Sequence, residues 1–203
     1  MMRFLGRTPP ARALGRLAAL IAATSVVAVA GCKDLTSIDA SFDNVTDSLD
    51  FFMLNNSPIG TETAINLFTG HRLRADETFA YDIAFDMDSL YRIRIIPVRA
   101  LATTHSSPYS VGLQKLTGAS FAQVTDAPRT GYVADSVITV TVGDVVAIES
   151  HDVTRCGFAI KGSSYFSKLV VTSIDTAVKK ISTVIEVNRN CGFHSFAEGK
   201  PKD

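Results

Sequence analysis

The pattern of hydrophobic and polar positions changes near residue 48. Residues 17–30 form one uncharged, mostly apolar run, whereas the chain after residue 48 holds short apolar runs separated by polar residues. Most of these short runs have a period of two, which is the period of a strand with one buried and one exposed face. The pattern therefore predicts a body of β-strands behind an N-terminal segment of a different kind.

About eight strands are predicted in this body, and almost no helix. The predicted strands are 48–54, 64–68, 79–87, 90–98, 136–142, 145–149, 165–174 and 181–187. Segment 119–124 is predicted to form one helical turn. Many short strands without intervening helices are typical of an all-β fold, either an antiparallel β-sandwich or a flattened barrel.

Two dipeptides between neighbouring predicted strands are turn signals and predict hairpins: Asp88-Ser89 and Gly143-Asp144. In segment 90–98, Ile93 and Ile95 alternate with arginines, which predicts one buried and one wet face. Pro97 is expected at a strand end or edge, because it has no N–H to give to a neighbouring strand.

Composition and charge narrow the classes of function. The chain has 203 residues, 46% of them hydrophobic, which is enough for one domain with a buried core. Residues 1–31 hold four arginines and no acidic residue, so the rest of the chain has 16 basic residues against 20 acidic ones. A mildly acidic body lacks the dense basic patch that nucleic-acid binding needs, and that class is excluded.

Residues 1–31 have the parts of a secretory signal peptide. A basic head, residues 1–16, precedes the apolar run 17–30, which ends at small residues. In a helix, fourteen residues rise only about 21 Å, which is short of the roughly 30 Å hydrocarbon core of a bilayer. We therefore expect a cleaved signal, and the alternative is a short anchor that is never cut.

The segment Val29-Ala30-Gly31-Cys32 resembles the lipobox of bacterial lipoproteins. The resemblance implies that the Cys32 sulfur receives a diacylglyceryl group, that the chain is cut before Cys32, and that the new amino group can take a third acyl chain. Two or three acyl chains anchor a protein stably to a membrane. The chain is then exported and lipid-anchored at the cell envelope, with residues 32–47 as a lipidated tether and 48–203 as a single β-domain.

Lys33, which follows the lipid site, bears on the choice of membrane. In bacterial lipoproteins an aspartate at this place favours retention in the inner membrane. The expected location in a bacterium with two membranes is therefore the outer membrane.

Cys156 and Cys191 form an even pair once Cys32 is lipidated, and a disulfide is the expected state in an oxidising compartment. If segments 145–149, 165–174 and 181–187 form a meander, both cysteines emerge at the same end of it, provided that residues 151–163 are a loop. A redox-active or metal-binding thiol pair is the alternative, although the chain has no C-x-x-C spacing.

No common catalytic signature is present: the chain lacks H-E-x-x-H, G-x-S-x-G, a P-loop and G-x-G-x-x-G. We therefore expect a protein that is not an enzyme and has no cofactor. In a strand, Asp82, Asp86 and Asp88 would share one face, where they could bind calcium or act as an acid/base pair. The favoured interpretation is a solvated strand face running into a turn.

Of the four histidines, His71 and His105 lie in loop-like stretches and are expected at the surface. His151 and His194 fall near the predicted disulfide, where a metal or haem site is the speculative alternative to the absence of any metal.

Segment 79–85, FAYDIAF, resembles the W-D-x-x-F segment of HmuY-like lipoproteins, and segment 165–169, YFSKL, resembles a Y-A-K strand in that family. The likeness covers roughly residues 75–190. It implies an all-β fold at the cell envelope, in a family whose best-known members capture haem through two histidines. None of the four histidines aligns with those ligands, so no ligand role is carried over.

These observations lead to one main hypothesis and two others. The main hypothesis is a non-enzymatic, lipid-anchored binding or structural module at the cell envelope, whose partner is an envelope protein or a small ligand. The first alternative is a haem- or metal-scavenging lipoprotein of the HmuY type. The second is a hydrolase that uses the aspartates of residues 82–88.

Overall fold

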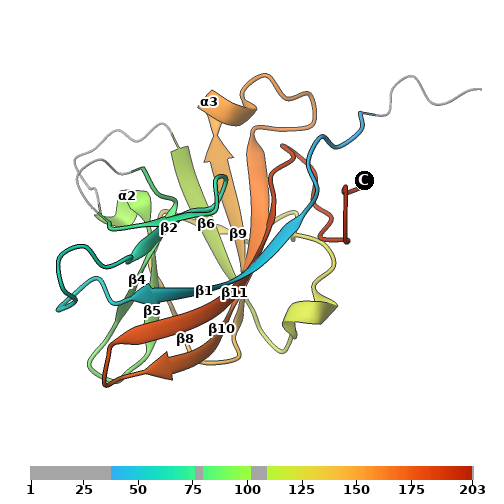
Figure 1. The fold of residues 1–203 in the computed structure, drawn as a ribbon. Coiled ribbons are helices and arrows are strands. Elements are labelled where there is room, and N and C mark those ends of the chain that lie inside the picture. The colour runs from blue at the N-terminus through green and yellow to red at the C-terminus, as the bar shows by residue number, and fades with distance from the viewer. Residues whose placement is uncertain (1–37, 76–79, 102–108, 203) are drawn as a thin grey trace, which may run out of the picture. The chain divides into compact units, whose positions relative to one another are not determined.

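The computed structural model describes residues 38–75, 80–101 and 109–202. From residue 40 onward, the described part folds into two antiparallel sheets that face each other (Figure 1). The first sheet has six strands, in the order β1 (Val45–Phe52), β11 (Lys180–Asn188), β10 (Ser164–Asp175), β9 (Val145–Asp152), β6 (Tyr109–Leu116) and β7 (Val133–Ala134). The second has five, in the order β3 (His71–Leu73), β2 (Ala64–Asn66), β4 (Ile83–Met87), β5 (Ile93–Pro97) and β8 (Ile138–Val140).

The predicted all-β class is confirmed, and the two-sheet arrangement is that of a sandwich. Every predicted strand has a counterpart, while β3, β6 and β7 are strands that the pattern did not predict. Among the described residues, helical structure is limited to α2 (Val98–Leu101), α3 (Val153–Cys156) and a 3-10 turn at Phe121–Gln123, which lies inside the predicted helical turn 119–124. No helix in this part of the chain is long and apolar enough to cross a membrane.

The main core lies between the two sheets, and a smaller one lies on the opposite face of the first sheet. Along β10, Tyr165, Leu169 and Val171 point into the main core. Phe166 points the other way, into a cluster that Val124, Ala127, Val145 and Phe196 complete. A strand covered on both faces needs apolar residues at neighbouring positions rather than strict alternation, and Tyr165-Phe166 and Leu169-Val170-Val171 supply them in β10.

The order of β9, β10 and β11 confirms the predicted meander. Ala147 pairs with Lys168, and Lys168 pairs with Glu186 on its other side. The predicted hairpin between 79–87 and 90–98 is also confirmed, although its loop has five residues rather than two. Pro97 is the last residue of β5, as predicted.

The hairpin predicted at Gly143-Asp144 is wrong. β8, before this turn, pairs with β5 in the second sheet, whereas β9, after it, pairs with β6 and β10 in the first. The turn itself is well formed, since the Asp144 carboxylate accepts hydrogen bonds from the backbone N–H and the hydroxyl of Thr141. It therefore carries the chain from one sheet to the other, which a local turn signal does not distinguish from a hairpin.

The folded domain begins earlier than the predicted boundary between tether and domain at residue 48. β1 starts at Val45, and Ala40 is already buried. The backbone N–H groups of Ser41 and Phe42 donate to Oδ1 of Asn190, at 2.7 and 2.9 Å. The polar residues before β1 can therefore pack against the domain, because their backbone N–H groups donate to the buried Asn190 side chain.

Candidate functional site

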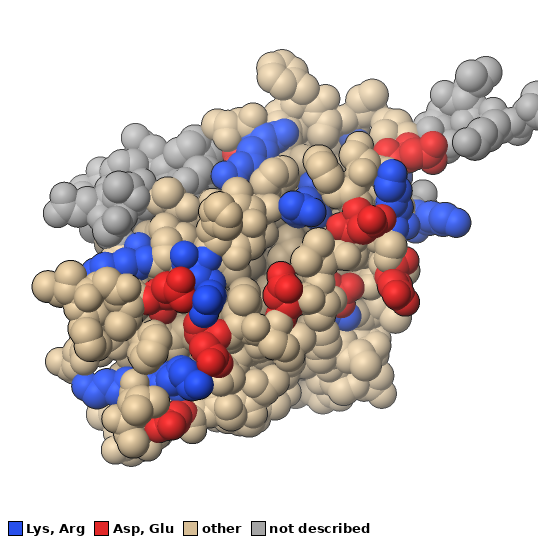
Figure 2. All heavy atoms as spheres, in the orientation of Figure 1, with Lys and Arg blue, Asp and Glu red and all other residues tan. Residues whose placement is uncertain are grey.

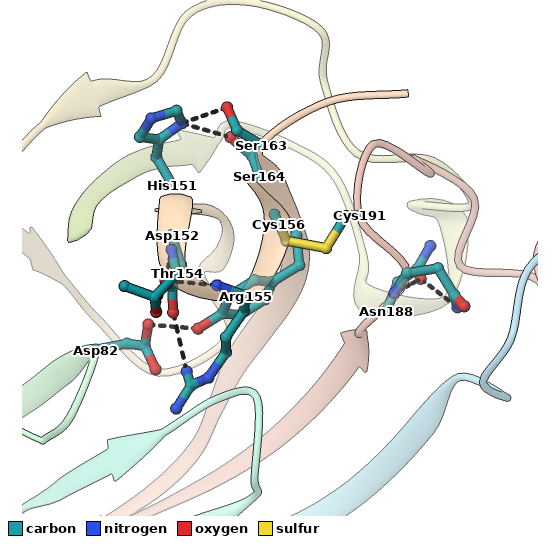
Figure 3. The surroundings of a disulfide bond; sticks show 12 residues. Asp82, His151, Asp152, Thr154, Arg155, Cys156, Ser163, Ser164, Asn188 and Cys191 are labelled. Atoms are coloured by element: carbon teal, nitrogen blue, oxygen red, sulfur yellow. Dashed lines mark hydrogen bonds and ion pairs between the residues drawn. A yellow bond between two sulfur atoms is a disulfide. The ribbon is translucent and has the colours of Figure 1, made fainter. Parts of the chain in front are cut away.

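The structure joins Cys156 and Cys191 in a disulfide, with 5.6 Å between their Cα atoms (Figure 3). Cys156 ends α3, whose N-cap Asp152 accepts hydrogen bonds from the backbone N–H groups of Thr154 and Arg155. Cys191 lies three residues beyond β11. The cysteines therefore meet at one end of the meander, as predicted, although β9 runs on to Asp152 before the connection begins.

Asp82 is buried between the sheets just before β4, so its predicted place on a solvated face is wrong. The Tyr165 hydroxyl donates to its Oδ1, and the Leu67 backbone N–H donates to its Oδ2, both at 2.7 Å. Burial raises the pKa of the Asp82 carboxyl. The pKa of Tyr165 is also raised, mainly by burial and secondly by the nearby Asp82 charge. The carboxylate holds Leu67, and with it the loop after β2.

The other two aspartates of the predicted trio have separate partners. Asp86 is also buried, and it accepts a 2.6 Å hydrogen bond from Nδ2 of Asn55. Asp88 lies in the β4–β5 turn, where it forms a 2.7 Å ion pair with Arg92. The three carboxylates therefore do not form one site, and no group of three or more metal-binding side chains occurs among the residues that the structure describes.

His151 and His194 each have their own partners. Nδ1 of His151 hydrogen-bonds with the hydroxyls of Ser163 and Ser164, at 3.0 and 3.3 Å (Figure 3). Nδ1 of His194 lies 3.2 Å from the carbonyl oxygen of Ala127, and its ring stacks on Phe166. His71 is exposed on β3, and His105 lies outside the described residues. The imidazoles of His151 and His194 therefore each have a local hydrogen-bonding or packing role.

A shallow hollow of about 270 Å³ lies on the outer face of the first sheet, with both polar and apolar residues in its lining, among them His151, Glu149 and Tyr132. The Tyr132 hydroxyl is buried and has no hydrogen-bond partner in the described part of the chain. Burial and, to a lesser extent, the Glu149 charge raise the pKa of this phenol, so it stays protonated and can donate.

An apolar pocket of about 130 Å³ opens between the two sheets, at the edge formed by β1 and β11. One wall comes from the inward positions of these two strands, and the other from β2 and the loop that follows it. Its lining is mainly aliphatic and aromatic: Val45, Leu49, Ile65, Leu67, Phe68, Ile185 and Val187, with Asp47, Thr69, Gly70 and Arg189.

The pocket exists because the second sheet is short at this edge. β2 and β3 have three residues each, whereas β1 has eight and β11 has nine. Phe51 of β1 is fully covered, but Leu49 is only half-buried and Asp47 is exposed. The inward face of β1 is thus left progressively open toward its start.

The loop after β2 that walls the pocket is held rigidly. Asn66 accepts hydrogen bonds from the Thr69 backbone N–H and hydroxyl through its Oδ1, both at 3.0 Å. Gly70 adopts a φ of +71° to close the turn. The Phe68 ring packs edge-on against Tyr165, and the Arg155 guanidinium lies 4.8 Å from its centre. The wall is therefore preformed by the same buried network that contains Asp82.

Arg189 places a cation in the lining of the pocket. It follows Ile185 and Val187 at a spacing of two on β11 and just beyond it, so it lies on their side of the chain. Its guanidinium lies 5.3 Å from the centre of the Phe42 ring. Nε of Arg189 is buried and has no hydrogen-bond partner among the described residues.

None of the pocket residues was predicted from the sequence. The run Ile185, Val187 and Arg189 did carry a signal, because an arginine continues a series of inward positions there. That pattern can be interpreted only once β2 and β3 are known to be too short to cover this part of β11.

The predicted lipidation site, Cys32, and the predicted signal peptide lie outside the described residues. Comparison of the chain with protein-family models, with curated proteins and with solved structures found no match. The resemblances to lipoproteins and to the HmuY-like family therefore stay predictions.

Proposed function

We propose that the protein is a lipid-anchored binding protein of the cell envelope, whose β-domain takes a small ligand with an apolar body and an anionic end. The observation that carries the proposal is the apolar pocket between the sheets with Arg189 in its lining. The lipobox-like segment at Val29–Cys32 and a disulfide-bonded domain both favour an exported location.

The walls of the pocket set the apolar part of the ligand. Burial of apolar surface contributes roughly 25 cal/mol per Å², and the lining here is dominated by Leu, Ile, Val and Phe side chains. A cavity of about 150 Å³ in another protein holds a benzene ring, so a pocket of about 130 Å³ suits a short alkyl chain or a single ring.

Arg189 sets the polar end of the ligand. A guanidinium binds a carboxylate through two parallel N–H donors, and hydrogen bonds to charged groups contribute about 1.5–3 kcal/mol. Asp47, which also lines the pocket, is exposed and disfavours an anion on its own side. The ligand's acid group is therefore expected near Arg189 and Phe42, with the apolar body directed toward Leu67.

Calorimetric titration of the purified chain with octanoate and with benzoate tests the pocket. Saturable binding of one molecule per chain is expected for at least one of the two, and the uncharged octanol should bind more weakly than octanoate. Arg189→Gln should weaken carboxylate binding by about tenfold or more. Arg129→Gln, at an exposed arginine elsewhere, is the matched control and should bind as the unaltered chain does.

A second variant blocks the apolar part. Val45→Trp places a large ring at the mouth of the pocket, at a position that is already partly exposed, and it should abolish binding without unfolding the domain. Val178→Trp, on the β10–β11 turn, is its control. Absence of saturable binding for both acids, or equal affinity of the Arg189→Gln and Arg129→Gln variants, refutes the proposed ligand class.

The anchor is tested separately. Cys32→Ser should leave an uncleaved precursor that no longer takes up labelled palmitate in a bacterial host. Normal labelling of that variant contradicts the lipoprotein assignment and leaves the pocket proposal untouched.

A further inference from the structure

The connection between α3 and β10 carries two large apolar side chains into solvent. Phe158 is 100% exposed and Ile160 is 87% exposed, and Val153 at the start of α3 is 48% exposed. We call these three residues the apolar tip. In Figure 2, residues other than Lys, Arg, Asp and Glu project at the end of the domain that carries α3, with basic side chains set back from it.

The tip is held in place at its base. The disulfide is formed by Cys156, which lies between Val153 and Phe158, and the Ala159 backbone N–H donates to the Cys156 carbonyl oxygen at 2.9 Å. On the other side, Nζ of Lys161 lies 4.0 Å from the centre of the Phe193 ring. Phe158 and Ile160 are therefore exposed on a loop whose base is fixed by the disulfide. Because the fold already orders this loop, a binding partner does not have to supply the conformational entropy of ordering it.

The chain enters the domain at this same end. Ser41 and Phe42 are docked on Asn190 by hydrogen bonds in both directions, since Nδ2 of Asn190 also donates to the Phe42 carbonyl oxygen at 2.8 Å. Asn190 is the neighbour of Cys191, which the disulfide ties to the base of the tip. The first docked residues and the apolar tip thus share one anchoring point.

The tether between the proposed lipid site and the folded domain is short, so the domain stays close to the membrane. Seven residues, 33–39, separate the proposed lipid-bearing Cys32 from Ala40. Fully extended, the steps from Cys32 to Ala40 reach at most about 29 Å. Segment 153–163 contains Arg155 and Lys161 and no acidic residue. Asp152, just before it, forms a 3.2 Å ion pair with Arg155, so its charge is balanced at the base of the tip.

We propose that the apolar tip inserts into the interfacial layer of the membrane that holds the lipid anchor, and that it orients the domain on that membrane. The inference rests on the proposed lipidation of Cys32. Aromatic and aliphatic side chains flanked by basic residues are the composition of segments that bind at this depth. Val153, Phe158 and Ile160 then form a second contact beside the acyl chains, and the opposite end of the sandwich faces away from the bilayer.

Tryptophan fluorescence tests the proposal directly, because the chain has no tryptophan of its own. Phe158→Trp puts a single reporter at the tip. Leu90→Trp is the matched control, since Leu90 is 68% exposed in the β4–β5 turn. That turn lies at the other end of the sandwich, on the side of the β10–β11 turn. The backbone N–H of Leu54 donates to the Phe85 carbonyl oxygen in β4, and that of the neighbouring Met53 donates to the Lys179 carbonyl oxygen in the β10–β11 turn.

Each full-length variant is purified from bacterial membranes and reconstituted into vesicles of phosphatidylethanolamine and phosphatidylglycerol with brominated acyl chains. The tryptophan of the Phe158→Trp chain should be quenched at least about twofold and shifted to shorter wavelength relative to unbrominated vesicles, whereas that of the Leu90→Trp chain should be unaffected. Adding Ile160→Ser and Val153→Ser to the Phe158→Trp chain should reduce the quenching.

The outcomes separate the tip from the anchor, because mass spectrometry of the same samples reports the lipid on Cys32. If the lipidated chains show no more quenching for the tip reporter than for the control reporter in the β4–β5 turn, the proposal is overturned, and the tip is then a surface for a protein partner. Equal strong quenching of both reporters also overturns it, because the domain is then not oriented. If the chain carries no lipid and its tip reporter is still quenched, membrane insertion of the apolar tip is supported and lipidation of Cys32 is contradicted.

Discussion

The hydroxyl of Tyr165 donates a 2.7 Å hydrogen bond to Oδ1 of Asp82, and this bond joins the two sheets inside the core. Tyr165 belongs to β10 of the first sheet, and Asp82 leads into β4 of the second. Both side chains are buried. Because Asp82 also holds the backbone of Leu67, the same carboxylate supports the wall of the apolar pocket.

Tyr165→Phe should destabilise the domain by about 1–3 kcal/mol, because Oδ1 of Asp82 loses its donor while remaining buried. The measurement is the free energy of unfolding from urea titration. Tyr91→Phe is the control, since Tyr91 is exposed in a turn, and it should change stability by less than about 0.5 kcal/mol. Equal stability of the two variants contradicts the assigned role.

The raised pKa of Asp82 predicts the sign of a pH effect. A carboxyl whose pKa in the folded state lies above the ordinary 3.8 contributes stability that is fully present below 3.8 and is lost as the pH rises through the folded-state pKa. The free energy of unfolding of the unaltered chain, minus that of Asp82→Asn, should therefore decrease as the pH is raised above about 4.

Asp88→Asn provides the opposite sign. Hydrogen bonds from the Arg92 backbone and side chain lower the pKa of the Asp88 carboxyl. Its contribution is therefore present above 3.8 and is lost as the pH falls through the lowered pKa, so the corresponding difference should decrease toward acid pH. A pH dependence of the same sign for the two variants is incompatible with these assignments.

Local periodicity was sufficient to predict the fold class and the β9–β10–β11 meander, because both depend on runs of alternating or continuous apolar residues. It failed where the answer depended on distant partners. The turn at Gly143-Asp144 has the local chemistry of a hairpin, yet the pairing of β8 with β5 places the two flanking strands in different sheets.

The site was less predictable than the fold. The disulfide could be predicted because two cysteines at the same end of a meander have few alternatives in an exported domain. Asp82 and Asp86 were misplaced on a solvated face, since charge predicts exposure unless a buried partner such as Tyr165 is known. The pocket depends on how far β2 and β3 extend opposite β1 and β11, and no short-range pattern records that.

The Cys156–Cys191 disulfide closes a separation of 35 residues, for which the chain-entropy model gives about 3–4 kcal/mol. The double variant Cys156→Ala with Cys191→Ala should lose stability by about this amount, discounted for strain. Urea titration of the variant and of the reduced, alkylated chain should give similar losses. A loss below about 1 kcal/mol in both contradicts a stabilising role. Mass spectrometry without reduction should find the two cysteine peptides linked.

A buried ion pair lies on the outer face of the first sheet. Nζ of Lys168 lies 3.0 Å from Oε2 of Glu186 on the adjacent strand, with both side chains almost fully covered. It also donates to the carbonyl oxygens of Phe121 and Val124, at 3.0 and 2.7 Å. The lysine thus attaches the 3-10 turn to the sheet.

Lys168→Met should destabilise the domain by about 3–5 kcal/mol, because it leaves the Glu186 charge buried without a partner. Lys168→Met combined with Glu186→Leu should cost less than the sum of the two single changes, since the double variant removes both charges together. Lys115→Met is the control, because the Lys115–Asp144 pair is partly exposed, and it should cost less than about 1 kcal/mol. Urea titration of the unaltered chain, the two single variants and the double variant measures the coupling, and strict additivity of the two changes contradicts a direct interaction between the buried charges.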